Sequence, residues 1–203
     1  VYRYPVYRTP DDLIILEPPM RLFDDREPLS RVRLEDGHFK PYYTRGDLMY
    51  SSALASYVLC WVQDPIELFF LHVQGSGRIQ FDDGSVLRIG FDNHNGHPYR
   101  SIAKVLVERG EMSASEASMQ RIQAWATAHP EQVDALLAEN PRFIFFRVLS
   151  DLDPQEGPVG ALGVPLTPER SIAVDLSYGM GGFPIFLSTT MPNAEAPLNR
   201  LVF

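Results

Sequence analysis

Apolar residues in the middle of the chain recur every three or four positions, a spacing that predicts a group of helices. The clearest helix begins at Ser101, a good N-cap, and ends before Gly110, a typical residue just past a helix. Pro130 interrupts the apolar pattern between two later helices. Helices are therefore predicted over residues 45–54, 101–109, 114–128 and 131–139.

Short apolar runs bounded by turn residues predict strands elsewhere in the chain. Asp82-Asp83-Gly84 separates two such runs and predicts a hairpin. Residues 57–73 fit either a strand or a buried helix, with Pro65 dividing them. Residues 1–19 are expected to be extended, and the charged residues 24–36 to form a loop or an exposed edge. Strands are predicted over residues 74–81, 85–91, 143–149, 171–175, 183–188 and 200–203.

The change in periodicity near Phe143 predicts two domains, residues 1–140 with strands and helices, and residues 141–203 as part of a small β-barrel. At 203 residues and 45% hydrophobic content the chain can bury a substantial core. Its 17 prolines and 14 glycines favour a turn-rich protein with much β structure. The predicted fold class is therefore mainly β with helices.

The net charge of −8 changes which partners are expected. No basic cluster stands out, so nucleic acid is not an expected partner. An acidic protein is not attracted to an anionic polymer, so any such polymer must be held by neutral contacts. Cys60 is the single cysteine, which excludes a disulfide within the chain and favours a buried small side chain. No apolar run approaches the ~20 residues needed to span a bilayer.

Two segments combine glycines with neutral hydrogen-bonding side chains: Gln-Gly-Ser-Gly at residues 74–77 and Asn-Gly-His-Pro-Tyr-Arg-Ser at residues 95–101. Amide, hydroxyl and imidazole groups donate and accept hydrogen bonds, and glycine lets a ligand approach the backbone, which suits sugar recognition. The candidate binding residues, expected to line one groove, are Gln74, Gly75, Ser76, Gly77, Asn95, His97 and Tyr99. Alternatively, these segments are two glycine-rich turns, and the second only braces the start of the following helix.

Carboxylates are the other chemistry considered, because glycosidic cleavage needs an acid to protonate the leaving oxygen. Asp175 is the best-placed acid by sequence, at the end of a predicted strand. The other candidates are Glu67, Asp82, Asp83 and Asp92, of which Asp82 and Asp83 are expected to form a turn. Arg78, Arg88 and Arg100 are candidates for binding a substrate carboxylate.

Several other classes of site are excluded by spacing. His94 and His97 lack a third ligand, so no metal site is expected. The sequence holds no nucleophile elbow of a serine hydrolase, no phosphate-binding loop and no dinucleotide fingerprint. No cofactor is therefore expected.

Several long segments resemble the membrane-bound lytic murein transglycosylase A (MltA) family, in order and along nearly the whole chain. They are residues 69–79 (Phe-Phe-Leu-His-Val-Gln-Gly-Ser-Gly-Arg-Ile), 95–102, 108–111, 140–147 (Asn-Pro-Arg-Phe-Ile-Phe-Phe-Arg), 157–161 and 170–175 (Arg-Ser-Ile-Ala-Val-Asp). The resemblance implies a bacterial enzyme that cleaves the β-1,4 bond between N-acetylmuramic acid and N-acetylglucosamine of peptidoglycan without water, leaving a 1,6-anhydro sugar.

The resemblance also implies two β domains, a double-psi β-barrel and a second barrel inserted into it, with the glycan between them. Residues 1–140 would be the inserted domain, and residues 141–203 an incomplete part of the double-psi barrel. A periplasmic, outer-membrane-associated monomer is expected, with a lipid anchor outside this chain. The partner implied is the glycan strand of peptidoglycan.

Two departures from the family pattern bear on activity. The family's Gly-Tyr-Tyr-x-Pro segment is expected before Val1, and its catalytic aspartate motif just after Phe203. The 203 residues by themselves are therefore expected to bind glycan without cleaving it, with Asp175 as the weak rival for the catalytic acid. Two alternatives remain: a non-catalytic module that binds cell-wall glycan, and a scaffold protein of the envelope.

Overall fold

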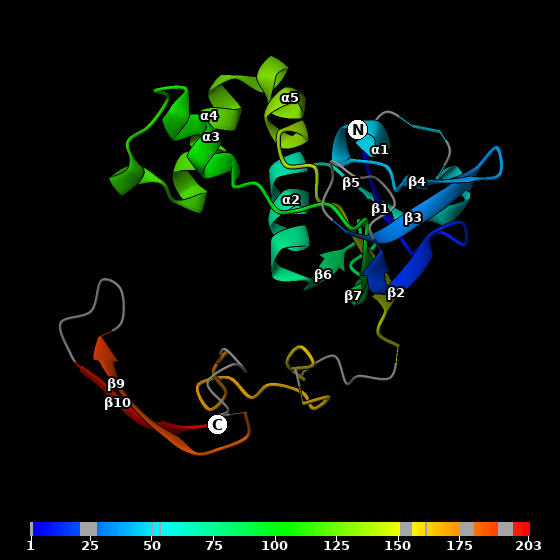
Figure 1. Ribbon diagram of the computed structural model, residues 1–203. Coiled ribbons are helices and arrows are strands. Elements are labelled where there is room, and N and C mark those ends of the chain that lie inside the picture. Colours follow the sequence, from blue (N-terminus) through cyan, green and yellow to red (C-terminus); the bar gives the residue numbers. More distant parts are fainter. Residues whose placement is uncertain are drawn as a thin grey trace. The chain divides into compact units, whose positions relative to one another are not determined.

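The computed structural model describes residues 2–20, 28–49, 51, 52, 54–150, 156–160, 162–174, 181–190 and 197–203. The chain forms two compact units, Val1–Val148 and Leu149–Phe203 (Figure 1). This division lies eight residues beyond the predicted boundary between residues 140 and 141. The difference arises because β8 (Ile144–Val148) pairs with β7 (Val86–His94) and so belongs to the first unit.

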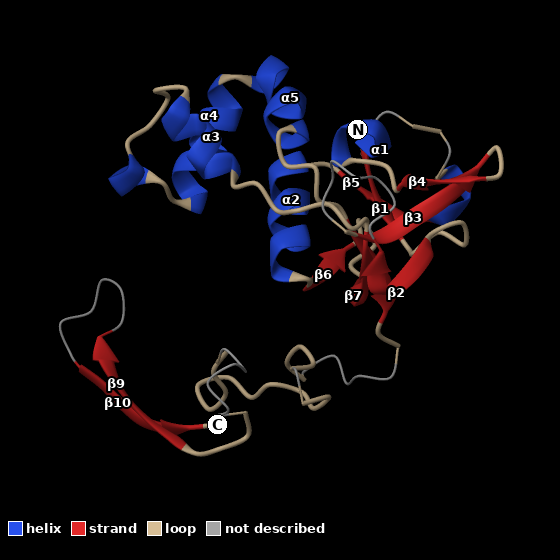
Figure 2. Cartoon of the chain, in the orientation of Figure 1, coloured by secondary structure: helices blue, strands red, loops and turns tan. Residues whose placement is uncertain are grey.

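The described residues of the first unit form three antiparallel sheets (Figure 2). β1 (Tyr4–Tyr7) pairs with β5 (Val58–Val62). A second sheet has the order β2 (Ile14–Met20), β3 (Leu29–Glu35) and β4 (His38–Pro41). The third has the order β6 (Ser76–Gln80), β7 and β8, with β6 and β7 joined by the hairpin predicted at Asp82-Asp83-Gly84.

The α-helices in the described part of the first unit are α1 (Arg45–Met49), α2 (Pro65–Gln74), α3 (Ile102–Glu108), α4 (Met119–Ala128) and α5 (Val133–Ala138). Short 3₁₀ turns lie at Ala55–Tyr57, Ala114–Glu116 and Pro130–Gln132. The Ser101 side chain accepts a hydrogen bond from the Lys104 N–H and so caps α3 as predicted. The predicted helix over residues 114–128 is instead a 3₁₀ turn followed by α4.

In the described residues, the core of the first unit consists of one cluster of buried side chains among the helices and two clusters next to the sheets. α2 contributes Ile66 and Phe69 to a cluster with the apolar faces of α3, α4 and α5, and Figure 1 shows these helices gathered beside α2. A second cluster surrounds Tyr42 and Phe145. A third packs Cys60 against β7 and β8 residues, which confirms that this cysteine is buried.

One expectation for the first unit is wrong. β3 lies between β2 and β4, so residues 29–35 form a central strand and not a loop or an edge. Its charged side chains are accommodated because Arg33 pairs with Glu35 and lies over the ring of Tyr43. Both alternatives for residues 57–73 occur, a strand (β5) before Pro65 and a helix (α2) from Pro65 onward. The helix begins there because Asp64 accepts hydrogen bonds from the N–H groups of its first turn.

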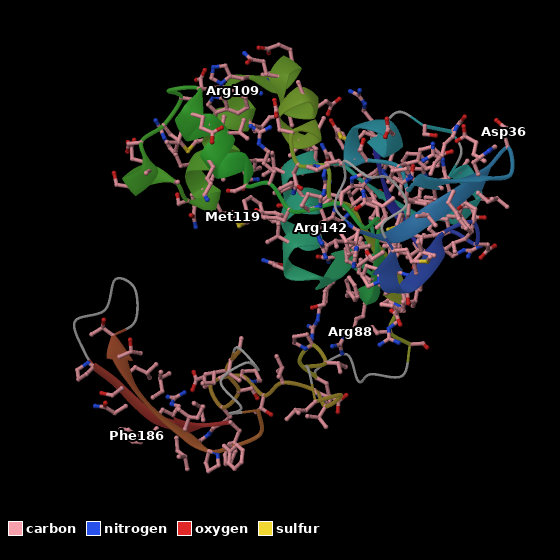
Figure 3. All side chains as sticks on the ribbon, in the orientation of Figure 1. Asp36, Arg88, Arg109, Met119, Arg142 and Phe186 are labelled. Atoms are coloured by element: carbon pink, nitrogen blue, oxygen red, sulfur yellow. The ribbon has the colours of Figure 1, made fainter. Side chains whose placement is uncertain are left out.

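In the second unit, β9 (Ile185–Thr190) pairs antiparallel with β10 (Pro197–Val202), close to the predicted strands. Phe186, labelled in Figure 3, is 67% exposed on β9. The predicted strand 171–175 is not a strand over residues 171–174, although the backbone N–H of Ile172 donates to the carbonyl of Phe203. The strands in the described part of the chain form open sheets, and none of these sheets closes into a barrel.

Candidate functional site

The end of α2 places the first glycine-rich segment on the surface of the first unit. Asp64 and Pro65 start the helix, and Gln74 is its last residue. Gly75 follows with φ 77°, a left-handed conformation that glycine adopts without strain, and its N–H donates to the carbonyl of Leu71 at 2.9 Å. The Gln74 side chain is thereby left exposed where the helix gives way to β6.

Two hollows of the first unit meet at Gln74, which lines both. The larger, of about 1400 Å³, is bordered by α2, β5, β6 and part of α4, and includes the half-exposed rings of Tyr2 and Trp61. The smaller, of about 460 Å³, is lined by Arg45, His72, Val73, Gln74, Gly75, Phe91, Tyr99, Asn140, Arg142 and Ile144.

The structure brings some of the predicted binding residues together. Gln74, Gly75 and Tyr99 line the smaller hollow, and Gly77 joins Gln74 at the larger one. Ser76 lines neither hollow and opens β6. At Gly77 a side chain would place its Cβ 2.5 Å from a methyl carbon of Leu71, so the Leu71 side chain would have to turn aside to accommodate it.

Asn95 is buried, with 1% exposure, and its amide is fully used within the protein. Its Nδ2 donates to the carbonyls of Tyr43 and Pro141, both at 2.8 Å. Its Oδ1 accepts from the N–H of Phe143 at 2.8 Å. Asn95 therefore joins three backbone segments, as the bracing alternative predicts, and it does not line either hollow.

His97 has a similar structural position. Its Nε2 donates to the carbonyl of Tyr42 at 2.7 Å, and its backbone carbonyl accepts from Nη1 of Arg142 at 3.3 Å. Tyr99 differs from both, because its ring is 52% exposed and lines the smaller hollow. Of the second segment, Tyr99 alone among the predicted residues faces a hollow in the described structure.

The sequence reasoning missed the polar residues at the back of the smaller hollow. Arg45 is 4% exposed, and its Nη1 lies 3.0 Å from Nδ1 of His72, which is also 4% exposed. The Nε and Nη2 atoms of Arg45 donate to the carbonyls of Asn140 and Arg142 at 3.2 and 2.7 Å. Asn140 in turn accepts at its Oδ1 from the N–H groups of Arg100 and Arg142.

Burial and neighbouring cations dominate the electrostatics here. Burial lowers the pKa of Arg45 to about 9 and holds the pKa of His72 well below its usual range. Burial first, then Arg142 and Arg31, lowers the pKa of His94 to about 4. At neutral pH the two histidines are therefore neutral, and Arg45 is a cation.

The candidate acids are placed mainly in structural roles. Asp83 accepts from the N–H and hydroxyl of Ser85, as expected of a turn, and these bonds lower its pKa. Asp82 accepts from the Tyr2 hydroxyl and Asp92 from the Thr9 hydroxyl. Glu67 is exposed in the first turn of α2 and lines the larger hollow. Asp175 lies outside the described residues.

The candidate arginines lie outside the smaller hollow. Arg100 forms ion pairs with Glu139 and Glu108, so its charge is already matched. Arg78 and Arg88 face each other in the register of β6 and β7. In the described residues no three metal-binding side chains gather, and none of the helices there has the length and apolar character to cross a membrane.

Comparison with known proteins identifies the family of this chain. Residues 1–147 match the family model described as the MltA specific insert domain. The chain is 43% identical over 134 residues to membrane-bound lytic murein transglycosylase A of Escherichia coli K12, and 36% identical over 140 residues to that of Vibrio cholerae. These matches cover 64% and 68% of this chain, and 35% and 37% of the relatives.

Solved structures give the same result over nearly the whole chain. The lytic transglycosylase LtgG of Burkholderia pseudomallei is 50% identical with a TM-score of 0.69, and MltA of Neisseria gonorrhoeae is 35% identical with a TM-score of 0.83. A structure of E. coli MltA with bound chitohexaose is 28% identical with a TM-score of 0.77. The chain covers 53%, 56% and 53% of these three proteins.

The chain thus spans about a third of the curated relatives and about half of the solved ones. Its first unit coincides closely with the matched insert domain, which ends at residue 147. The chain belongs to the MltA family of lytic murein transglycosylases, and the part that its family model matches is the MltA specific insert domain.

Proposed function

We propose that this chain is part of a lytic transglycosylase of peptidoglycan and that its first unit contributes to holding the glycan strand. The reaction is non-hydrolytic cleavage of the β-1,4 bond between N-acetylmuramic acid and N-acetylglucosamine. Family membership supports the reaction class. The E. coli relative with bound chitohexaose supports a glycan ligand.

The single observation that carries the binding proposal is the position of Gln74 between two hollows. Its exposed amide can donate to and accept from sugar hydroxyl and acetamido groups. Tyr2 and Trp61 add half-exposed rings on the larger side, and Tyr99 adds one on the smaller side. Aromatic faces next to a few polar groups suit a carbohydrate.

Cleavage in this mechanism needs a carboxyl group that first protonates the glycosidic oxygen. The same group then takes the proton from the C6 hydroxyl of N-acetylmuramic acid as that oxygen attacks C1, which gives the 1,6-anhydro product. A partly desolvated site raises an aspartate's pKa toward this requirement. No carboxylate is among the described residues that line the smaller hollow, so we assign it binding and not proton transfer.

The aspartate that transfers the proton is proposed to come from sequence beyond Phe203, with Asp175 as the rival within the chain. We further propose that the part of the predicted second domain that follows β8, residues 149–203, contributes to a double-psi β-barrel. The whole protein is proposed to be a monomer at the periplasmic side of the outer membrane, held there by a lipid anchor. The relatives' description as membrane-bound supports this location. The alternative is a glycan-binding module without catalytic activity. It is favoured for the 203 residues taken by themselves, because the described residues that line the smaller hollow include no carboxylate.

Titration calorimetry with chitohexaose tests the binding proposal. One neutral hydrogen bond contributes about 0.5–1.5 kcal/mol, so Gln74→Ala should weaken binding several-fold with an unchanged circular dichroism spectrum. Gln120→Ala, which removes an exposed amide of α4 outside both hollows, is the matched control. Equal affinities for the two variants would contradict the role of Gln74.

Mass spectrometry of peptidoglycan digests tests the reaction. The 203-residue chain should release no 1,6-anhydro-muropeptides, and a chain continuing past Phe203 should release them. If the 203-residue chain is active, the proposed location of the acid is wrong. In that case Asp175→Asn decides whether Asp175 is the acid, because a folded, inactive variant would assign the proton transfer to it.

A further inference from the structure

The smaller hollow has an unusual charge balance for a neutral-sugar site. Its back wall is formed by Arg45 of α1, His72 of α2 and Arg142, which precedes β8. Figure 3 shows Arg142 next to α2, between the helices and the strands of the first unit. Among the described residues, its lining contains two arginines and no aspartate or glutamate. A ligand in this hollow therefore meets positive charge and hydrogen-bond donors.

Arg45 is a buried cation with only neutral partners among the described residues. Its guanidinium donates to two backbone carbonyls and to the ring of His72. The rings of Phe69 and Phe143 lie 4.9 and 5.1 Å from its central carbon. Carbonyl dipoles and ring faces stabilise a cation in part, but burying a charge without an opposite charge beside it remains costly.

His72 supplies a donor that has no acceptor within the protein. Because Arg45 has only donors, the Nδ1 of His72 must accept, and the proton of the neutral ring is then on Nε2. That Nε2 is buried and has no hydrogen-bond partner in the described structure. The rings of Phe143 and Phe146 pack on the imidazole and hold it in place. A buried polar group without a partner points to a missing acceptor.

Arg142 adds the second cation. It donates to the carbonyl of His97, and no described carboxylate forms an ion pair with it. Burial and the nearby Arg31 lower its pKa, which indicates that the charge is poorly compensated. Gln74 and Tyr99 bring an amide and a phenol to the same hollow. Bidentate binding of a carboxylate is the interaction for which arginine geometry is best suited.

We propose that this hollow is a subsite for a carboxylate carried by the glycan strand, with Arg142 and the Nε2–H of His72 as donors and Arg45 as the buried charge behind them. The inference rests on the proposed function, since it names the substituent that the same strand presents. The carboxylate has two sources in this polymer, the lactyl group of N-acetylmuramic acid or the attached peptide. Both share the same recognition chemistry.

Calorimetry with three probes at low ionic strength tests the subsite and separates the two sources. N-acetylglucosaminyl-N-acetylmuramic acid has a free lactyl carboxylate, its tetrapeptide derivative carries carboxylates only on the peptide, and chitobiose carries none. At least one carboxylated probe should bind about tenfold more tightly than chitobiose, and the tighter of the two identifies the source. Equal affinity for all three overturns the subsite but leaves glycan binding intact, whereas no binding of any probe overturns both proposals.

Arg142→Gln should lower the ratio of the affinities for the carboxylated probe and for chitobiose to about one. Arg121→Gln removes an exposed charge of α4 outside the hollow and should leave this ratio unchanged. A preference that survives Arg142→Gln overturns the proposal. If that variant does not fold, nitrogen-15 NMR of the unaltered protein decides the question. Saturation with the carboxylated probe should shift the Nε2 resonance of His72. An unchanged resonance would mean that the probe's carboxylate does not accept a hydrogen bond from this nitrogen, which overturns the proposal.

Discussion

Substitution of Asn95 tests whether its side chain contacts the ligand or only holds segments of the protein backbone together. Asn95→Ala removes three side-chain hydrogen bonds, to the carbonyls of Tyr43 and Pro141 and from the N–H of Phe143. Each contributes about 1 kcal/mol net, and the buried N–H of Phe143 loses its partner. We therefore expect the free energy of unfolding of the first unit to fall by about 3–4 kcal/mol.

Urea unfolding followed by tryptophan fluorescence measures this loss, because both tryptophans, Trp61 and Trp125, lie in the first unit. With an m-value of about 2 kcal/mol per molar urea, the midpoint should fall by about 1.5–2 M. Asn95→Asp should cost more, because it turns a donor into an acceptor that faces two carbonyls. Gln120→Ala, in an exposed part of α4, should change stability by less than about 0.5 kcal/mol.

The result that would refute this reasoning is a loss below about 1 kcal/mol for Asn95→Ala together with weaker chitohexaose binding. That outcome would mean that the Asn95 amide faces the ligand, as the sequence first indicated. Unchanged affinity of the folded variant, with the expected loss of stability, would assign Asn95 to the framework that carries Tyr99 and Arg142.

Three further predictions follow from the local geometry. Gly75→Ala should destabilise the first unit by about 1 kcal/mol in urea unfolding, because φ is 77° there although the nearest atom to a new Cβ is 3.7 Å away. Ser101→Ala should cost about 1 kcal/mol in the same assay by removing the cap of α3. His94 is neutral in the folded state, with its pKa lowered to about 4, and its Nδ1 accepts from the N–H of Gly96. Protonation favours the unfolded chain, so about 1–2 kcal/mol of stability, after allowance for solvent screening, should be present above pH 6.5 and lost toward pH 4. Wild type and a His94→Gln variant compared at pH 7 and pH 4.5 should converge at the lower pH, and parallel losses would contradict this origin.

Local signals in the sequence were sufficient for several elements. Asp82-Asp83-Gly84 marks a hairpin because its side chains and glycine favour a tight turn whatever surrounds them. Ser101 and Gly110 mark the two ends of α3 for the same local reason. Pro65 marks the change from β5 to α2, as predicted, and the pair Asp64-Pro65 is a typical helix start. The family motifs were also readable from the chain alone.

Only the tertiary structure decided which of the polar residues face a ligand. Asn95 and Tyr99 are four residues apart and look alike as candidates, but backbone carbonyls and an N–H from distant segments occupy Asn95 and leave Tyr99 exposed. The charged back wall depends on contacts between Arg45, His72 and Asn140, up to 95 positions apart. No local periodicity encodes such pairings, because they arise from the packing of α1, α2 and the segment before β8. The sequence by itself therefore determined the family and many local elements, while packing between distant segments determined the charge and the hydrogen-bonding groups of the hollow.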